Sequence, residues 1–127
     1  MKISHLDHLV LTVVNIDKTC EFYSEVLGME IVTFEKNKKA LQFGNQKIYL
    51  HLFKHETFPK ARNSTPGSAD LCLITTTPLE AVLKELTEQK IPVLEGGISE
   101  RLGATGKIRS VFFRDPDLNL IAVSNYI

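Results

Sequence analysis

Two histidines stand where their side chains could bind a metal ion together. His8 lies in the apolar, β-branched run of residues 6–13, and His51 lies in the similar run of residues 47–53. Both runs are typical of β-strands, in which alternate side chains point to the same face. If the two strands are neighbours, we expect His8 and His51 to meet on the face that no helix covers. Neutral imidazoles in that arrangement suit a divalent ion, namely nickel, zinc, manganese or iron(II).

An internal repeat shows which later positions correspond to these histidines. Residues 7–12 resemble residues 70–75, and the likeness continues to the end of the chain. By this repeat His8 corresponds to Leu71 and His51 corresponds to Ala122, and neither Leu nor Ala can bind a metal. Asp70 is expected to face away from the site. The predicted metal site is therefore incomplete, and water or substrate must supply the remaining ligands.

Each half of the chain has the pattern of a strand, a helix and three further strands. Apolar periodicity predicts strands at residues 6–13, 31–35, 39–43 and 47–53 in the first half, and at 71–75, 93–94, 108–114 and 120–125 in the second. Asn15 or Asp17 is expected to cap the first helix, and Thr77 the second. The Gly-rich stretch of residues 96–106 is expected to be a flexible loop.

These elements predict an α+β fold of two tandem βαβββ modules, with curved sheets around a cleft. The first module covers about residues 1–58, and the second covers residues 69–127. A polar connector at about residues 54–68 contains Pro59, Pro66 and Gly67. Two such modules together make a single domain of residues 1–127. Within its pocket we expect Tyr49, Phe43 and Phe113 as lining, and Arg101 as a contact for an anionic substrate.

Composition and hydropathy argue against several classes of function. The chain has 127 residues with 15 basic and 15 acidic side chains, and this zero net charge argues against a nucleic-acid partner. The sequence contains no apolar run long enough to span a membrane, and the N-terminal residues lack the apolar core of a signal peptide. We therefore expect a cytoplasmic protein with a small-molecule substrate or ligand. Cys20 and Cys72 are expected to be small buried hydrophobes.

Three groups of residues resemble one known superfamily. They are the opening Leu6-Asp7-His8-Leu9-Val10-Leu11, the helix with Phe22-Tyr23 and Leu27-Gly28, and the closing run of residues 113–121. Together with the paired βαβββ pattern, they resemble the vicinal-oxygen-chelate superfamily over nearly the whole chain. That superfamily contains glyoxalase I, fosfomycin-resistance enzymes, extradiol dioxygenases and bleomycin-resistance proteins. Within it, residues 39–44, 66–68, 71–75 and 123–126 look like the glyoxalase domain-containing protein 5 group.

The resemblance implies a ligand set and also shows where this chain departs from it. The implied metal-ligand positions are His8, His51, Leu71 and Ala122. Leu71 replaces the usual His, and Ala122 replaces the Glu that moves a proton in glyoxalase I-like chemistry. The resemblance also implies a homodimer.

Three functions follow as alternatives from the residues and the resemblance. The first is a weakly metal-dependent lyase or isomerase, similar to lactoylglutathione lyase, that acts on a substrate chelated through adjacent oxygens. The second is a metal-free protein that binds or sequesters a small ligand, as bleomycin-resistance proteins do. The third is a degenerate member whose remaining role is dimerisation.

Overall fold

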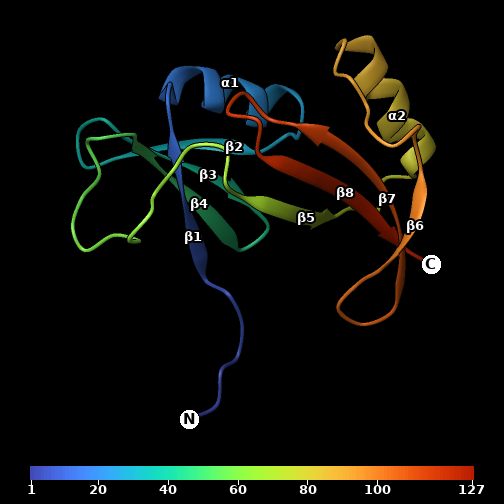
Figure 1. The fold of residues 1–127 in the computed structure, drawn as a ribbon, viewed down its shortest axis with the longest axis horizontal. Coiled ribbons are helices and arrows are strands. Elements are labelled where there is room, and N and C mark those ends of the chain that lie inside the picture. Colours follow the sequence, from blue (N-terminus) through green and yellow to red (C-terminus); the bar gives the residue numbers. More distant parts are fainter. The chain divides into compact units, whose positions relative to one another are not determined.

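A computed structural model describes residues 1–127 and divides them into two compact units, residues 1–67 and residues 68–127. Each unit contains one four-stranded sheet and one helix, as Figure 1 shows. The order of elements is βαβββ in both units. The predicted α+β fold of two tandem modules is therefore confirmed.

The first unit consists of β1 (His8–Val13), α1 (Ile16–Glu25), β2 (Glu30–Phe34), β3 (Lys38–Phe43) and β4 (Gln46–Leu52). Its strand order is β1-β4-β3-β2, with β1 parallel to β4 and the other pairs antiparallel. Asn15 caps α1 as expected, because its side-chain oxygen accepts a hydrogen bond from the backbone N–H of Lys18 at 2.9 Å. Gly28 then leaves the helix with a φ of +68°, which a residue with a side chain rarely adopts.

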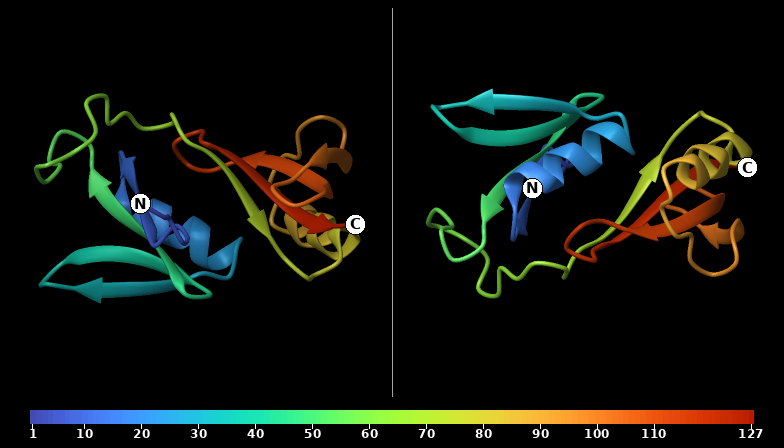
Figure 2. Two further views of the ribbon diagram at one scale, coloured as in Figure 1. Left: turned by 90° about the horizontal axis from the view of Figure 1, so that it is seen from below. Right: turned by 90° about the horizontal axis from the view of Figure 1, so that it is seen from above.

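The core of the first unit lies between α1 and one face of its sheet, and Figure 2 shows the helix lying along that face. Alternate strand residues are buried there: Leu11, Val13, Leu41, Ile48 and Leu50. From the helix they meet the buried side chains of Thr19, Cys20 and Tyr23. Burial also raises the pKa of the Cys20 thiol, so this cysteine is the apolar core residue that we expected.

The second unit consists of β5 (Asp70–Ile74), α2 (Leu79–Glu88), β6 (Ser99–Leu102), β7 (Lys107–Arg114) and β8 (Leu120–Tyr126). Its order, β5-β8-β7-β6, matches that of the first unit, and β5 is parallel to β8. Apolar side chains of α2 and of one sheet face form the core, including Leu79, Leu86, Val111, Phe113 and Ile121.

Two local predictions for the second unit are wrong. Residues 93–94 form no strand, although the N–H of Leu94 donates one hydrogen bond of 2.8 Å to the carbonyl of Phe112. Positive φ angles at Glu95, Gly96 and Gly97 turn the chain immediately afterwards. The strand forms instead as β6, within the stretch predicted to be a loop, where it pairs with β7.

The second helix also begins differently from the prediction. Pro78 is the N-cap residue of α2, and no side chain within the helix caps it. Instead, the side-chain oxygen of Asn125 in β8 accepts a hydrogen bond from the N–H of Leu79 at 3.1 Å. The amide nitrogen of Asn125 donates to the carbonyls of Thr75 and Thr77. The cap is therefore a long-range one, which the local capping pattern around Thr77 could not show.

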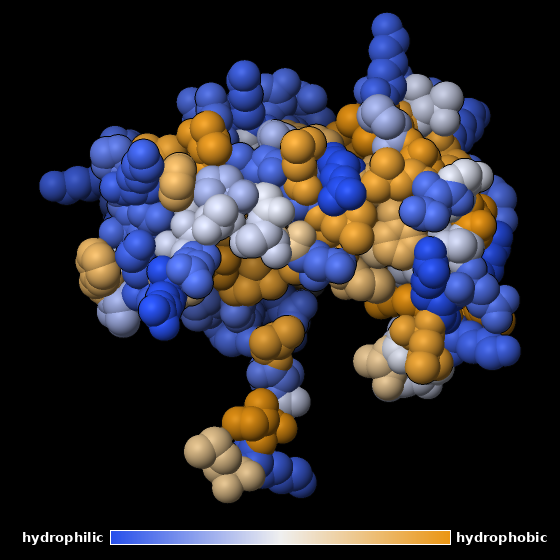
Figure 3. Space-filling model, in the orientation of Figure 1, coloured by the Kyte–Doolittle hydropathy of each residue, from blue (hydrophilic) through white to orange (hydrophobic).

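The segment before β1 belongs to no helix or strand and extends beyond the sheet of its unit. Its apolar side chains Met1, Ile3 and Leu6 are exposed, as Figure 3 shows for the projecting N-terminal residues. Neither α1 nor α2 is long and apolar enough to cross a membrane.

Candidate functional site

Both histidines lie on the sheet face of the first unit that α1 does not cover. Val10 pairs with Tyr49, and Thr12 pairs with His51, so His8, Tyr49 and His51 share this face. Leu11 and Leu50 point the opposite way into the core. Strand alternation in the sequence therefore gives the correct face for both imidazoles.

The register nevertheless separates the two histidines along the strands. His8 pairs with Lys47, whereas the partner of His51 is Thr12, four residues further along β1. At ~3.3 Å per residue this offset is about 13 Å. The β4 side chain next to His8 is Tyr49, whose ring centroid lies 4.8 Å from that of His8 in an edge-to-face arrangement. Within this unit, His8 and His51 do not fit as two ligands of one ion.

His8 is held by its neighbour in sequence. Its Nδ1 lies 2.9 Å from Oδ2 of Asp7, and this hydrogen bond lowers the pKa of the Asp7 carboxyl. In the neutral imidazole, an Nδ1–H that donates to the carboxylate leaves the Nε2 lone pair free. The side chain is 46% exposed, so Nε2 is accessible to a ligand or an ion.

His51 lies in a cavity of about 490 Å³ in the first unit. The cavity combines aromatic and polar side chains: Phe34, Glu35, Lys38, Tyr49, His51 and His55. The rings of Phe34 and Tyr49 meet edge to face with centroids 5.5 Å apart. Lys38 Nζ donates to Glu35 Oε2 at 2.9 Å, which balances the only carboxylate among these residues. The imidazoles of His51 and His55 therefore add hydrogen-bonding groups to a cavity that also has an aromatic wall.

The strand register of the second unit shows that the residues expected to correspond to the histidines were wrongly matched. Cys72 pairs with Ala122, so Asp70, Cys72 and Ala122 share the uncovered face of the second sheet. Leu71 pairs with the core residue Ile121 and points to the opposite face. Asp70, which opens β5 as His8 opens β1, is therefore the structural counterpart of His8, and the expected match to Leu71 is one residue out of register.

The same comparison changes the match on the last strand of each unit. Two residues after the openings of β1 and β5, Val10 pairs with Tyr49 and Cys72 pairs with Ala122. Ala122 is therefore the counterpart of Tyr49 and not of His51. Apolar strand runs still look alike when they are shifted by one residue, whereas a shift of one residue moves every side chain to the other face.

The uncovered face of the second unit contains a cavity of about 350 Å³. Asp70, Cys72, Arg101, Phe112 and Ala122 contribute to its lining. The guanidinium carbon of Arg101 lies 5.1 Å from the ring centroid of Phe112, a cation–π contact that holds Arg101 over this face. Cys72 is exposed, contrary to expectation, and its Sγ lies 3.4 Å from Oγ of Ser124.

The four residues expected to line a pocket are placed differently. Tyr49 lines the cavity of the first unit, and Arg101 lines that of the second. Phe113 is fully buried in the core with Ile121, and its neighbour Phe112 takes the place in the cavity wall. Phe43 is half-buried and shares the α1 side of β3 with Leu41.

Sequence reasoning missed Phe34 in the first cavity and Phe112 in the second, and it placed Asp70 and Cys72 away from the uncovered face. Because Cys72 and Ala122 lie on different strands, only the register of β5 against β8 brings them to one face. Within either unit, no three side chains of His, Cys, Asp or Glu gather closely enough to hold a metal ion.

Comparisons with known proteins agree with this fold. The chain is 54% identical over 127 residues to the virulence protein STM3117 of Salmonella typhimurium, covering all of this chain and 88% of that protein. It is 46% identical to the glyoxalase domain-containing protein RDO1 of Mycosarcoma maydis, over 99% of this chain and 70% of RDO1.

Solved structures give the same result. The crystal structure of STM3117 superimposes with a TM-score of 0.97 over the whole of both chains. The integron cassette protein VCH_CASS1 of V. cholerae is 54% identical, with a TM-score of 0.96 over 100% of this chain and 98% of that chain. The model of one family matches residues 5–123. The chain belongs to the Glyoxalase/Bleomycin resistance protein/Dioxygenase superfamily.

Proposed function

We propose that this protein binds a small, planar, oxygen-rich organic molecule in the cavity of its first unit. The observation that carries the proposal is the pairing of an aromatic wall, Phe34 and Tyr49, with the imidazoles of His51 and His55 in about 490 Å³. A volume of this size suits a small organic ligand. Aromatic side chains favour a flat ring, and ring N–H groups donate to carbonyl, phenol or carboxylate oxygens.

The test uses salicylate and catechol, which are flat rings with oxygens on adjacent positions. Benzene-1,4-diol is the comparison compound, because its two hydroxyl groups lie on opposite ring carbons. We expect salicylate or catechol to raise the melting temperature, because a ligand that binds only the folded state stabilises it. His51→Ala should abolish that increase, since the cavity loses one of its two imidazoles. The readout is thermal unfolding together with amide chemical shifts of β3 and β4.

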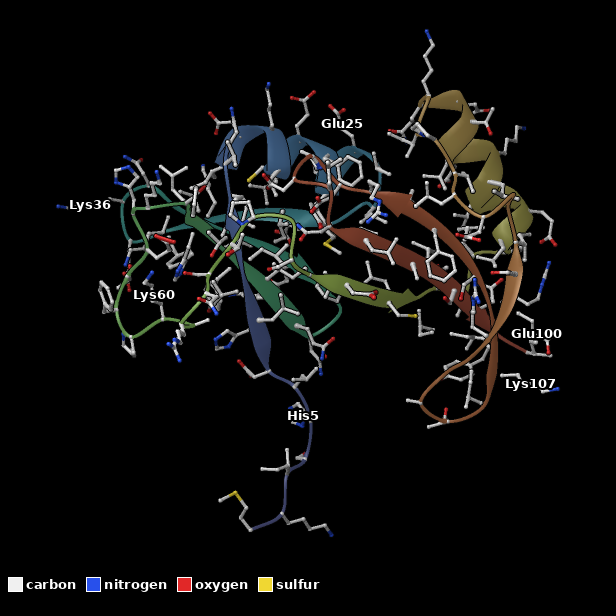
Figure 4. The ribbon with its side chains drawn as sticks, viewed as in Figure 1. His5, Glu25, Lys36, Lys60, Glu100 and Lys107 are labelled. Atoms are coloured by element: carbon white, nitrogen blue, oxygen red, sulfur yellow. The ribbon has the colours of Figure 1, made fainter.

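His5→Ala is the matched control for this experiment. His5 lies on the projecting N-terminal segment, as Figure 4 shows, and no residue of that segment lines the cavity. Binding to this variant should equal binding to the unchanged protein. A ligand that stabilises His51→Ala and Tyr49→Ala as strongly as the unchanged protein would show that the cavity is not the binding site.

A second candidate function, a metal-assisted lyase or isomerase step, is favoured by the Asp7–His8 pair. We propose that Nε2 of His8 contacts a divalent ion: nickel, zinc, manganese or iron(II). A carboxylate that accepts from the second ring nitrogen fixes the tautomer and orients a ligating imidazole, as in carboxylate–histidine–metal arrangements. When bound, such an ion polarises adjacent substrate oxygens.

Calorimetric titration of chelator-treated protein with each metal tests this assignment. We expect His8→Ala to lose the binding and Asp7→Asn to weaken it about tenfold or more, because the orienting carboxylate is removed. His5→Ala again serves as the control. His51→Ala should leave the metal affinity unchanged, because the register separates His51 from His8 along the strands. Unchanged affinity in His8→Ala would remove His8 from any metal site.

We further propose that the protein is a homodimer located in the cytoplasm. The free outer edges of β1 and β5 support the dimer, because each is the first strand in its sheet order and pairs on one side only. An unpaired strand edge is a surface on which another chain can add.

A further inference from the structure

The connector after β4 carries a second cavity, of about 380 Å³, that is distinct in character from the one around His51. We call it the connector pocket and define it by Lys54, Glu56, Phe58, Lys60, Arg62 and Ser64. Three of these side chains are cationic and one is anionic. In a chain whose total charge is zero, this is a local excess of positive charge.

The three cations have no carboxylate within ion-pair distance. The ion pairs of the protein join Asp7 to His8, Glu35 to Lys38, Glu80 to Arg109 and Glu100 to Lys107, and none includes Lys54, Lys60 or Arg62. Both lysines lie over aromatic rings: Lys54 Nζ is 5.5 Å from the Phe53 centroid, and Lys60 Nζ is 5.6 Å from the Phe58 centroid. These contacts orient the ammonium groups without neutralising them.

Glu56 is the one anionic side chain of the connector pocket, so the pocket keeps a net positive charge. Oε1 of Glu56 accepts from the Ser64 hydroxyl at 3.3 Å, and Lys60 Nζ donates to the same hydroxyl oxygen at 3.3 Å. Hydrogen bonds from its own backbone and the charge of Lys60 lower the pKa of Glu56, so it stays ionised near neutral pH. Ser64 thus holds Lys60 and Glu56 at one side of the pocket, and Arg62 is left without a partner.

Phe58 also lines the pocket, and its ring indicates which chemical group the ligand carries beside its phosphate. Its side chain is 79% exposed, although it is a large apolar ring. An exposed aromatic ring next to cations that form no ion pair suits a ligand whose flat ring stacks on the aromatic side chain while its phosphate contacts the cations. A volume of 380 Å³ suits one nucleotide-sized molecule.

We propose that the connector pocket binds a small phosphorylated molecule with a planar ring, the phosphate contacting Lys60 and Arg62 and the ring stacking on Phe58. The site is separate from the cavity of the proposed function, although Phe58 borders both. Lys60 is labelled in Figure 4, on the connector loop that follows β4.

Amide chemical-shift titration of the full chain tests the proposal with three probes: adenosine monophosphate, inorganic phosphate and adenosine. We expect adenosine monophosphate to shift amides of residues 53–65 with submillimolar affinity, phosphate to bind at least tenfold more weakly, and adenosine more weakly still. Lys60→Gln/Arg62→Gln should weaken adenosine monophosphate at least tenfold, and Glu56→Gln should strengthen it. Phe58→Leu should weaken adenosine monophosphate and leave phosphate unchanged.

Lys18→Gln/Lys84→Gln is the matched control, because it removes the same charge from exposed positions on the two helices. It should bind as the unchanged protein does. Three outcomes would overturn the proposal: no shifts in residues 53–65, equal loss in both double variants, or equal affinity for phosphate and adenosine monophosphate. None of these outcomes depends on salicylate or catechol, so the proposed function stands or fails separately.

Discussion

Replacing Phe113 with alanine is expected to lower the free energy of unfolding by about 4 kcal/mol, because it deletes a fully buried ring from the core. Phe113 pairs with Ile121, which is also fully buried, on the sheet face that α2 covers. The surrounding side chains can refill only part of the space that the ring leaves. Chemical denaturation followed by circular dichroism measures the loss.

Phe112→Ala is the control for this prediction, since it removes the same ring from the next position on β7. Phe112 is half-buried, faces Ala122 across the strands and lies under Arg101. Its loss should cost about 1 kcal/mol. If Phe112→Ala destabilises the protein as much as Phe113→Ala does, the two faces of β7 have been assigned the wrong way round.

The second large effect is expected at Asn119, which joins the end of the last turn to the start of β5. Its side-chain oxygen accepts from the N–H of Ala69 at 2.8 Å, and its amide donates to Oδ2 of Asp115 at 2.8 Å. Asn119 and Asp115 are 1% and 3% exposed, so water cannot replace these bonds without rearrangement. Asn119→Ala should cost about 3 kcal/mol, because the part-buried N–H of Ala69 and the buried carboxylate of Asp115 each lose a partner. Equilibrium unfolding in urea measures it.

Asn119→Asp sharpens this test through its pH dependence. It places a second carboxyl group next to Asp115 in a buried site, where the two can share a proton but cannot both ionise favourably. The folded variant therefore binds one proton between the two carboxyls more tightly than the unfolded chain does, so the stability that this proton provides is present at low pH and is lost as the pH rises. The variant should therefore be more stable at pH ~5 than at pH ~7 relative to Asn119→Ala.

Asn45→Ala, at an exposed turn position, should leave the stability nearly unchanged. A loss in Asn119→Ala no larger than that in Asn45→Ala would contradict the role given to the Asp115–Asn119 bonds. The two variants differ only in burial and in bonding, so their comparison isolates the contribution of this turn.

The order of elements, the two-module fold and the sheet face of each histidine could all be predicted from the sequence. These features follow from local periodicity, because the alternation of apolar residues indicates which face of a strand is buried. The cap at Asn15 could be predicted for the same reason, since it needs a side chain and a backbone N–H only three residues apart.

The tertiary structure alone decided which side chains meet on the uncovered faces. Tyr49 and not His51 lies beside His8, and Asp70 and not Leu71 corresponds to His8. The cap that Asn125 gives to α2 joins residues distant in sequence and could not be read locally. The physical reason is that each strand fixes its own alternation, whereas register comes from hydrogen bonds between segments far apart in the chain.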